Sequence, residues 1–211
     1  MKNLISYIFE KYDPNAIILY GSYANGTNNA NSDFDVLVIS NTHPYYHDAS
    51  FVDGVQLDLF VYPKAFFMEE EIDFMNFVQI FDGKIIFDNE NIGLWLKSEV
   101  NNAINNIPLK TYEENRTQVE WCEKMLFRSI RNDAEGHFRF YWVLIDSLEI
   151  YFDICSLRYF GPKKALNYMK KVDSTSYEIY SSALETASYL SLEKWIVKLK
   201  NKLEKNREDS N

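Results

Sequence analysis

Two apolar runs separated by a Gly-Ser turn constrain the fold of this chain more than any other feature. The first run, Ala16 to Tyr20, stops at Gly21-Ser22, and the second, Phe34 to Ile39, begins inside Asp33-Phe34-Asp35. Short apolar runs bounded by turn-forming residues are typical of buried strands. A helix is expected to begin at the Gly-Ser pair, with Ser22 near its N-cap position.

Three carboxylates follow from this strand pattern. Asp33 and Asp35 are two residues apart, so they project to one face of the sheet. A third run, Val55 to Tyr62, carries Asp58 and follows Asp53-Gly54, a turn that predicts an antiparallel neighbour. Two like charges at 4 Å repel by about 4 kcal/mol at an effective dielectric near 20, so such a cluster needs cations. Mg²⁺ or Mn²⁺ suits oxygen ligands, and a Gly-Ser turn at a helix N-terminus suits phosphate.

The remaining pattern predicts two domains. A helix over 2–12, a helix over 64–73 and a strand over 84–87 complete a first domain, residues 1–89. Residues 90–211 show helical periodicity almost throughout and form the second domain. Its expected helices are 90–104, 112–130, 137–158, 161–171, 174–188 and 191–204. The predicted fold class is α/β (α+β), a small mixed sheet followed by an all-α helical bundle.

Composition limits the possible partners. The 211 residues carry a net charge of −9, which argues against a protein that binds the backbone of a nucleic acid and favours a cationic second substrate. We expect no membrane partner, because no segment approaches the apolar length of a membrane span, and no signal peptide is recognisable. Cys122 and Cys155 lie in apolar helical patterns and are expected to be reduced, which indicates the cytoplasm.

One ordered motif consists of Gly21-Ser22, then Asp33-x-Asp35 after ten intervening residues, and a later Asp58. This motif resembles the polymerase beta-like nucleotidyltransferase superfamily. It is most similar to a small bacterial branch that includes kanamycin and lincosamide nucleotidyltransferases and antitoxin-type minimal nucleotidyltransferases. Further matches are Ala24, Gly26, Thr27 and Ser32. Tyr23 and Asn25 stand where that branch commonly has an Arg, so how this chain neutralises the phosphates is left open.

The resemblance implies site roles and a reaction. Asp33 and Asp35 would ligate two metal ions, and Asp58 would complete the catalytic one. Gly21 and Ser22 would hold the β- and γ-phosphates of a nucleoside triphosphate, with ATP as the expected one. The implied reaction is two-metal in-line transfer of a nucleoside monophosphate to a hydroxyl, with release of pyrophosphate. The acceptor would be a small molecule such as an antibiotic, and the negative charge of the chain favours a cationic one.

The helical half offers candidates for the acceptor side. On the helix 137–158 an apolar stripe is expected, formed by Phe138, Tyr141, Trp142, Ile145, Leu148 and Phe152. Asp146, Glu149 and Asp153 share a polar face, which is either an acceptor pocket with Asp146 or Glu149 as general base or an ordinary solvated face. Lys163 and Lys164 are either contacts for the triphosphate or surface lysines.

Other interpretations stay open at this stage. Arg131-Asn132 followed by His137 is similar to the motif of HEPN ribonucleases, so the bundle can be a fused or decayed relative of them. His43 and His47 are expected in a loop without a metal role. An antitoxin-like enzyme acting on a protein partner and a non-catalytic nucleotide-binding protein are the alternative functions, and a homodimer is possible.

Overall fold

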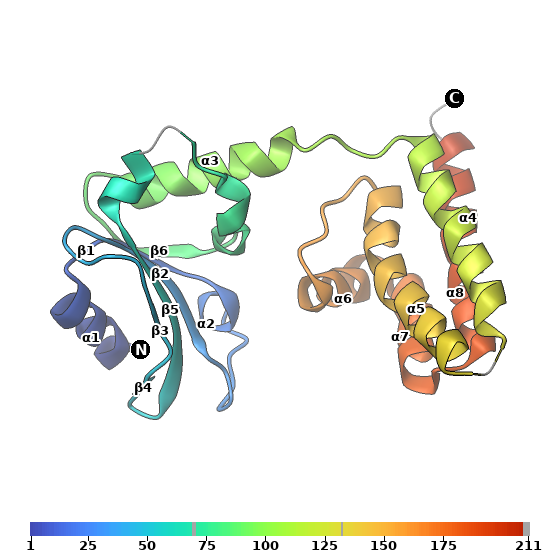
Figure 1. Cartoon of the computed structure of the whole chain (residues 1–211), viewed down its shortest axis with the longest axis horizontal. Coiled ribbons are helices and arrows are strands. Elements are labelled where there is room, and N and C mark those ends of the chain that lie inside the picture. Colours follow the sequence, from blue (N-terminus) through green and yellow to red (C-terminus); the bar gives the residue numbers. More distant parts are fainter. Residues whose placement is uncertain (69–70, 132, 209–211) are drawn as a thin grey trace. The chain divides into compact units, whose positions relative to one another are not determined.

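The computed structural model describes residues 1–68, 71–131 and 133–208. It consists of two compact units, Met1–Pro108 and Leu109–Asn211 (Figure 1). The division falls after helix α3, Ile92–Asn106, and therefore later than the predicted boundary at residue 89. α3 belongs with the first unit because it packs against strands β1 and β6 of that unit.

The first unit is built on a mixed sheet, as the sequence predicts. Its strands are β1 Pro14–Leu19, β2 Phe34–Ser40, β3 Tyr46–Asp48, β4 Phe51–Val52, β5 Val55–Pro63 and β6 Lys84–Asp88. The order is β3-β5-β2-β1-β6, with β4 paired to β5. β2 and β5 are parallel, and the other pairs are antiparallel. The β4–β5 hairpin closes at Asp53-Gly54, which confirms the predicted turn.

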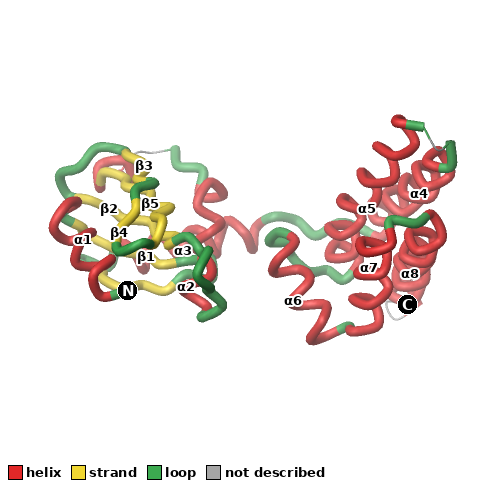
Figure 2. Tube along the Cα trace, turned by 90° about the horizontal axis from the view of Figure 1, so that it is seen from below, coloured by secondary structure: helices red, strands yellow, loops and turns green. Residues whose placement is uncertain are grey.

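The two faces of the sheet have different neighbours. Helix α1, Lys2–Tyr12, packs on the face that carries the fully buried side chains of β2 and β5: Phe34, Val36, Val38, Leu57, Leu59 and Val61. The alternate residues of these strands project to the opposite face. There Tyr62 contacts Phe77 of the 3₁₀ helix η2, Phe74–Ile80. Asp35 and Asp58 belong to this second face. Figure 2 shows the strands of the sheet in yellow with helix α1 beside them.

Two local predictions for the first unit are wrong. The expected loop 40–54 contains β3 and β4, which extend the hairpin back from its turn. The expected helix 64–73 is replaced by η1, Lys64–Met68, and η2, while residues 69–70 lie outside the described part. Tertiary packing overrides the local helical pattern here, because rings of both 3₁₀ helices gather around one strand residue, Tyr62.

The second unit is a bundle of helices, as predicted. They are α4 Tyr112–Ser129, α5 Ala134–Ile154, α6 Pro162–Val172, α7 Ser174–Thr186 and α8 Tyr189–Glu208. Thr111 and Glu114 form a capping box at the start of α4. At the centre, the fully buried Trp195 donates its Nε1–H to Ser147 Oγ at 2.9 Å. None of the described helices is long and apolar enough to cross a membrane.

Of the six residues in the predicted apolar stripe of α5, two are buried in the bundle and four are exposed. Leu148 and Phe152 are buried, whereas Phe138 is 67% exposed and Ile145 is 64% exposed. Tyr141 and Trp142 are also exposed. The core instead takes Phe140, Val143, Leu144 and Tyr151. α5 is apolar nearly all round, so its periodicity alone does not select the face that packs.

Candidate functional site

Gly21 lies directly against the Asp35 side chain, which leaves no room for a Cβ at Gly21. The Tyr20 N–H donates to the Asp35 carbonyl oxygen at 3.0 Å, which brings the end of β1 against the start of β2. Gly21 has a φ of +65°, and a Cβ built there would lie 2.0 Å from Asp35 Oδ2. A side chain at Gly21 would therefore meet both a strained backbone and an occupied space.

Asp35 and Asp58 are direct partners across the parallel pair β2–β5. Adjacent strands lie about 4.8 Å apart, so the two carboxylates share one face at close range. At about 5 Å and an effective dielectric near 20, two such charges repel by about 3 kcal/mol. Their strand neighbours are buried against α1, which fixes the register. The fold therefore places two acidic side chains next to each other on one face of the sheet.

Two aromatic side chains complete the surroundings of these carboxylates, and the sequence analysis assigned neither to this site. His47 Nε2 lies 2.7 Å from Asp58 Oδ1. Tyr20, 7% exposed, follows the last residue of β1 and lies close enough to both carboxylates to sense their charge. Burial, with added repulsion from Asp58 and Asp35, raises the pKa of the Tyr20 phenol far above its usual value. The phenol therefore stays neutral and adds no third negative charge.

The donor set fits a hard divalent cation. Asp33 is exposed immediately before β2, while Asp35 and Asp58 are half-buried. Among the described residues, no three His, Cys, Asp or Glu side chains stand together as a ready metal-binding group. However, two carboxylates on one face of adjacent strands, one of them packed against Gly21, provide oxygen ligands whose negative charge Mg²⁺ or Mn²⁺ would neutralise. The three-aspartate ligand set remains a prediction.

The Gly-Ser turn starts a very short helix, α2, Gly21–Asn25. Ser22 was expected near the N-cap position; Tyr20 holds that position, and Ser22 is the second helical residue, 7% exposed. Gly21 makes the turn itself through its positive φ. The predicted phosphate contacts of Gly21 and Ser22 are not tested by this geometry.

The helical unit contains a cavity of about 510 Å³ beside α4 and α5. Its lining comprises Lys110, Thr117, Gln118, Trp121, Trp142, Asp146, Glu149 and Ile150. The rings of Trp121 and Trp142 meet edge to face, 5.1 Å between centroids. Gln118 Oε1 is buried with no hydrogen-bond partner among the described residues. Of the three predicted acidic residues, Asp146 and Glu149 therefore line the cavity, and Asp153 pairs with Lys110 Nζ at 2.7 Å.

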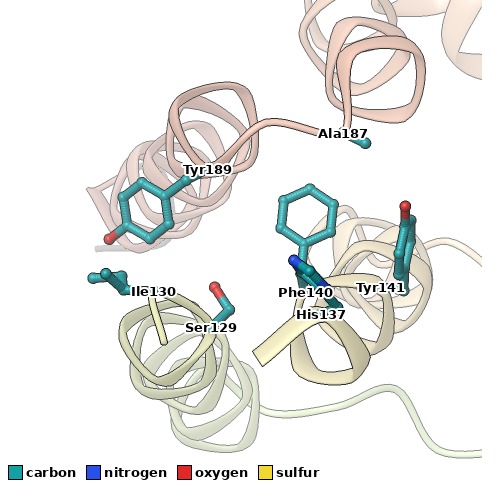
Figure 3. Close-up of a pocket in the computed structure, with 7 residues that line it drawn as sticks. All are labelled: Ser129, Ile130, His137, Phe140, Tyr141, Ala187 and Tyr189. Atoms are coloured by element: carbon teal, nitrogen blue, oxygen red, sulfur yellow. The ribbon is translucent and has the colours of Figure 1, made fainter. Parts of the chain in front are cut away.

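A second cavity, about 430 Å³, lies where α4, α5 and α8 come together. Figure 3 shows His137 and Phe140 on one side of it and Tyr189 and Ile130 on the other. The ribonuclease-like motif is at its edge, but Asn132 lies outside the described residues. Arg131 pairs with Asp133 at 2.8 Å and with Glu135 at 2.8 Å, which neutralises its charge locally. This pairing does not favour RNA cleavage.

The other predicted residues of the helical unit have ordinary surroundings. Lys163 and Lys164 lie in the first turn of α6, and Lys164 Nζ is 5.6 Å from the centre of the Phe160 ring. Cys122 and Cys155 are free thiols, buried and half-buried. Burial raises the pKa of the Cys122 thiol to about 12, so it is an unreactive core residue.

Comparison with known proteins decides the family. The sequence matches the model of the nucleotidyltransferase domain over residues 1–121 of the 211. The chain belongs to this family. The matched region contains the whole sheet unit with Gly21, Asp35 and Asp58, and it confirms the resemblance to the polymerase beta-like superfamily. Membership supports nucleotidyltransferase activity in general.

One solved structure similar to this nucleotidyltransferase-domain chain is a nucleotidyltransferase-like protein from Exiguobacterium sibiricum 255-15. The two are 12% identical with a TM-score of 0.42, over 97% of this chain and 73% of the other. The comparison with curated proteins gave no match.

Proposed function

We propose that this protein transfers a nucleoside monophosphate, with ATP as the first donor to test, to a hydroxyl of a small cationic acceptor. The observation that carries the proposal is the in-register pair Asp35 and Asp58 with Gly21 fitted against Asp35, in a chain of the nucleotidyltransferase domain family. A bound cation would offset the mutual repulsion of these carboxylates, so the pair favours cation binding.

In this proposal five residues of the sheet unit have a role. Asp33, Asp35 and Asp58 hold Mg²⁺ or Mn²⁺, and Gly21 and Ser22 contact the β- and γ-phosphates. The bound cation supplies neutralisation of the triphosphate charge and polarisation of the α-phosphoryl group. The acceptor oxygen forms a bond to the α-phosphorus. The bond between the α-phosphorus and the oxygen that bridges to the β-phosphate breaks, and pyrophosphate leaves with the bridging oxygen. The hydroxyl proton passes to a carboxylate, Asp58 or Glu149.

The cavity beside Trp121 and Trp142 is the proposed acceptor pocket. Indole faces and two carboxylates attract a cation, and the buried Gln118 Oε1 needs a donor that a ligand hydroxyl or ammonium would supply. Glu149 is the proposed general base for the acceptor hydroxyl, with Asp146 beside it. Lys163 and Lys164 are proposed as further contacts for the triphosphate.

The proposal is tested by incubating the protein with α-³²P-labelled nucleoside triphosphates, Mg²⁺ and a panel of aminoglycosides and lincosamides. Label is expected to move to an acceptor with the wild type and not with Asp33→Ala or Asp35→Ala. Glu10→Ala, which removes an exposed carboxylate from α1, is the matched control and should transfer normally. Transfer that survives both aspartate substitutions would refute the proposed mechanism.

A second candidate acceptor is a protein side chain. The exposed apolar residues of α5, including Phe138 at 67% and Ile145 at 64%, suit contact with another protein surface. An antitoxin-like enzyme would move the same label to a partner, for example to a tyrosine hydroxyl. Label recovered in a protein band and lost with Asp35→Ala would favour this candidate over a small acceptor.

A further inference from the structure

We propose that His47 is a positioning residue that holds the carboxylate of Asp58 in place for cation binding. This inference rests on the proposed function and extends it to a residue outside the predicted ligand set. His47 Nε2 lies 2.7 Å from Asp58 Oδ1. A carboxylate only accepts hydrogen bonds, so Nε2 carries the proton and donates it.

The cross-strand register explains why the two side chains meet. β3 and β5 are antiparallel, with His47 opposite Phe60 and Asp48 opposite Leu59. Asp58 is two residues before Phe60, so His47, Asp58 and Phe60 share one face of the sheet. The imidazole lies flat on the Phe60 ring, with centroids 4.3 Å apart and planes 11° apart. Stacking therefore sets the ring plane, and the hydrogen bond sets its direction.

The strand that carries His47 is itself anchored through the next residue. Asp48 points to the opposite face and is 2% exposed. It accepts hydrogen bonds from Tyr7 at 2.9 Å, from Lys11 at 3.0 Å and from the Tyr12 hydroxyl, all on α1. A buried, charge-assisted network of this kind fixes its strand firmly. β3 is therefore a rigid support from which His47 reaches Asp58.

Stability does not explain the pair. The side chains of His47 and Asp58 are 43% and 37% exposed, and exposed ion pairs contribute little to folding. In metal sites, by contrast, ligating carboxylates are themselves commonly hydrogen-bonded, and loss of the partner weakens metal binding 10- to 100-fold. With Oδ1 engaged by His47, Asp58 has its second oxygen for a cation.

The test measures Mn²⁺ binding by the electron paramagnetic resonance signal of free Mn²⁺, with α,β-methylene-ATP present. His47→Ala is expected to weaken the apparent Mn²⁺ affinity by about 10- to 100-fold. His47→Gln keeps an amide donor at similar reach and should restore affinity to within about threefold. His43→Ala, a histidine of the same segment whose ring contacts Tyr12 rather than Asp58, should bind as the wild type does. The melting temperature of His47→Ala should shift by less than about 3 °C.

The outcomes separate this role from the proposed function. If His47→Ala binds Mn²⁺ as tightly as the wild type while Asp58→Ala loses it, the role of His47 is refuted and the metal site stands. If His47→Gln is as weak as His47→Ala, donation from this position is not the cause, and the proposal is again refuted. If the wild type itself binds no Mn²⁺ with the nucleotide, the metal site and the role of His47 fall together.

Discussion

Gly21 and Gly26 offer a matched pair of substitutions that isolates the fit between backbone and carboxylate. Both have positive φ, +65° and +75°, at the start and the end of α2. A Cβ at Gly26 would have nothing within 4 Å, whereas a Cβ at Gly21 would lie 2.0 Å from Asp35 Oδ2 and 2.7 Å from its Cγ. Alanine at either position therefore strains the backbone, and only at Gly21 does it also displace the carboxylate.

The expected magnitudes follow from these two terms. A left-handed conformation costs a residue with a Cβ about 1–2 kcal/mol, so the free energy of unfolding of both variants should fall by this amount. The free energy of unfolding of Gly21→Ala should fall by about 1 kcal/mol more, because the Asp35 side chain must leave its preferred rotamer. The larger effect is expected on function, since a displaced Asp35 no longer faces Asp58. Gly21→Ala should weaken Mn²⁺ binding with α,β-methylene-ATP at least about 10-fold, as loss of an oriented ligand does.

Hydrogen exchange of peptides from β1 and β2 reports the free energy of unfolding for this unit. The Mn²⁺ titration described above reports the site. We expect Gly26→Ala to be destabilised but to bind Mn²⁺ like the wild type, and Gly21→Ala to be impaired in both measurements. Equal Mn²⁺ binding by the two variants would refute the reasoning, because it would show that Asp35 does not need the space beside Gly21.

Three other perturbations test the account. Asp35→Asn should abolish nucleotidyl transfer yet raise the free energy of unfolding without metal by about 1–3 kcal/mol, since it removes the repulsion with Asp58; hydrogen exchange that shows no gain would contradict this. Asp48→Asn should lower the free energy of unfolding by about 2–3 kcal/mol at pH 7. Hydrogen bonds within its buried network hold the pKa of Asp48 well below its usual range. The contribution of Asp48 to the free energy of unfolding is therefore present above about pH 4 and is lost as the pH falls below that value. The urea midpoints of the wild type and Asp48→Asn should accordingly converge in acid. Glu149→Gln should lower the rate of transfer to a hydroxyl about 100-fold with Mn²⁺ binding unchanged, and an unaltered rate would exclude Glu149 as the base.

The strands and the turn of the sheet unit were largely predictable, because the alternation of residues within each short strand decides which side chains share a face. The alternation of Phe34, Asp35 and Val36 correctly separates the buried face from the carboxylate face, and the Asp53-Gly54 turn correctly gives an antiparallel hairpin. His47 was missed because β3 has only three residues and no alternation of its own. Extending the hairpin register backward from Asp53-Gly54 would have placed it opposite Phe60.

The helical unit was less predictable in detail, for a physical reason. α5 has apolar residues on nearly every side, so sequence periodicity cannot tell Phe138, which is exposed, from Phe140, which is buried. What decides is the position of Trp195 and the other bundle residues, which are distant in sequence. Polar residues were easier to place, since Asp146 and Glu149 do share a cavity lining.

The most direct test of the central claim compares two labels on the same nucleotide. The protein, Mg²⁺ and an acceptor panel are incubated in parallel with α-³²P-ATP and γ-³²P-ATP, for the wild type and for Asp35→Ala. Nucleotidyl transfer predicts that the α-label enters the acceptor while the γ-label leaves as pyrophosphate, and that Asp35→Ala does neither. Label from the γ-position in the acceptor would instead show phosphoryl transfer and contradict the account.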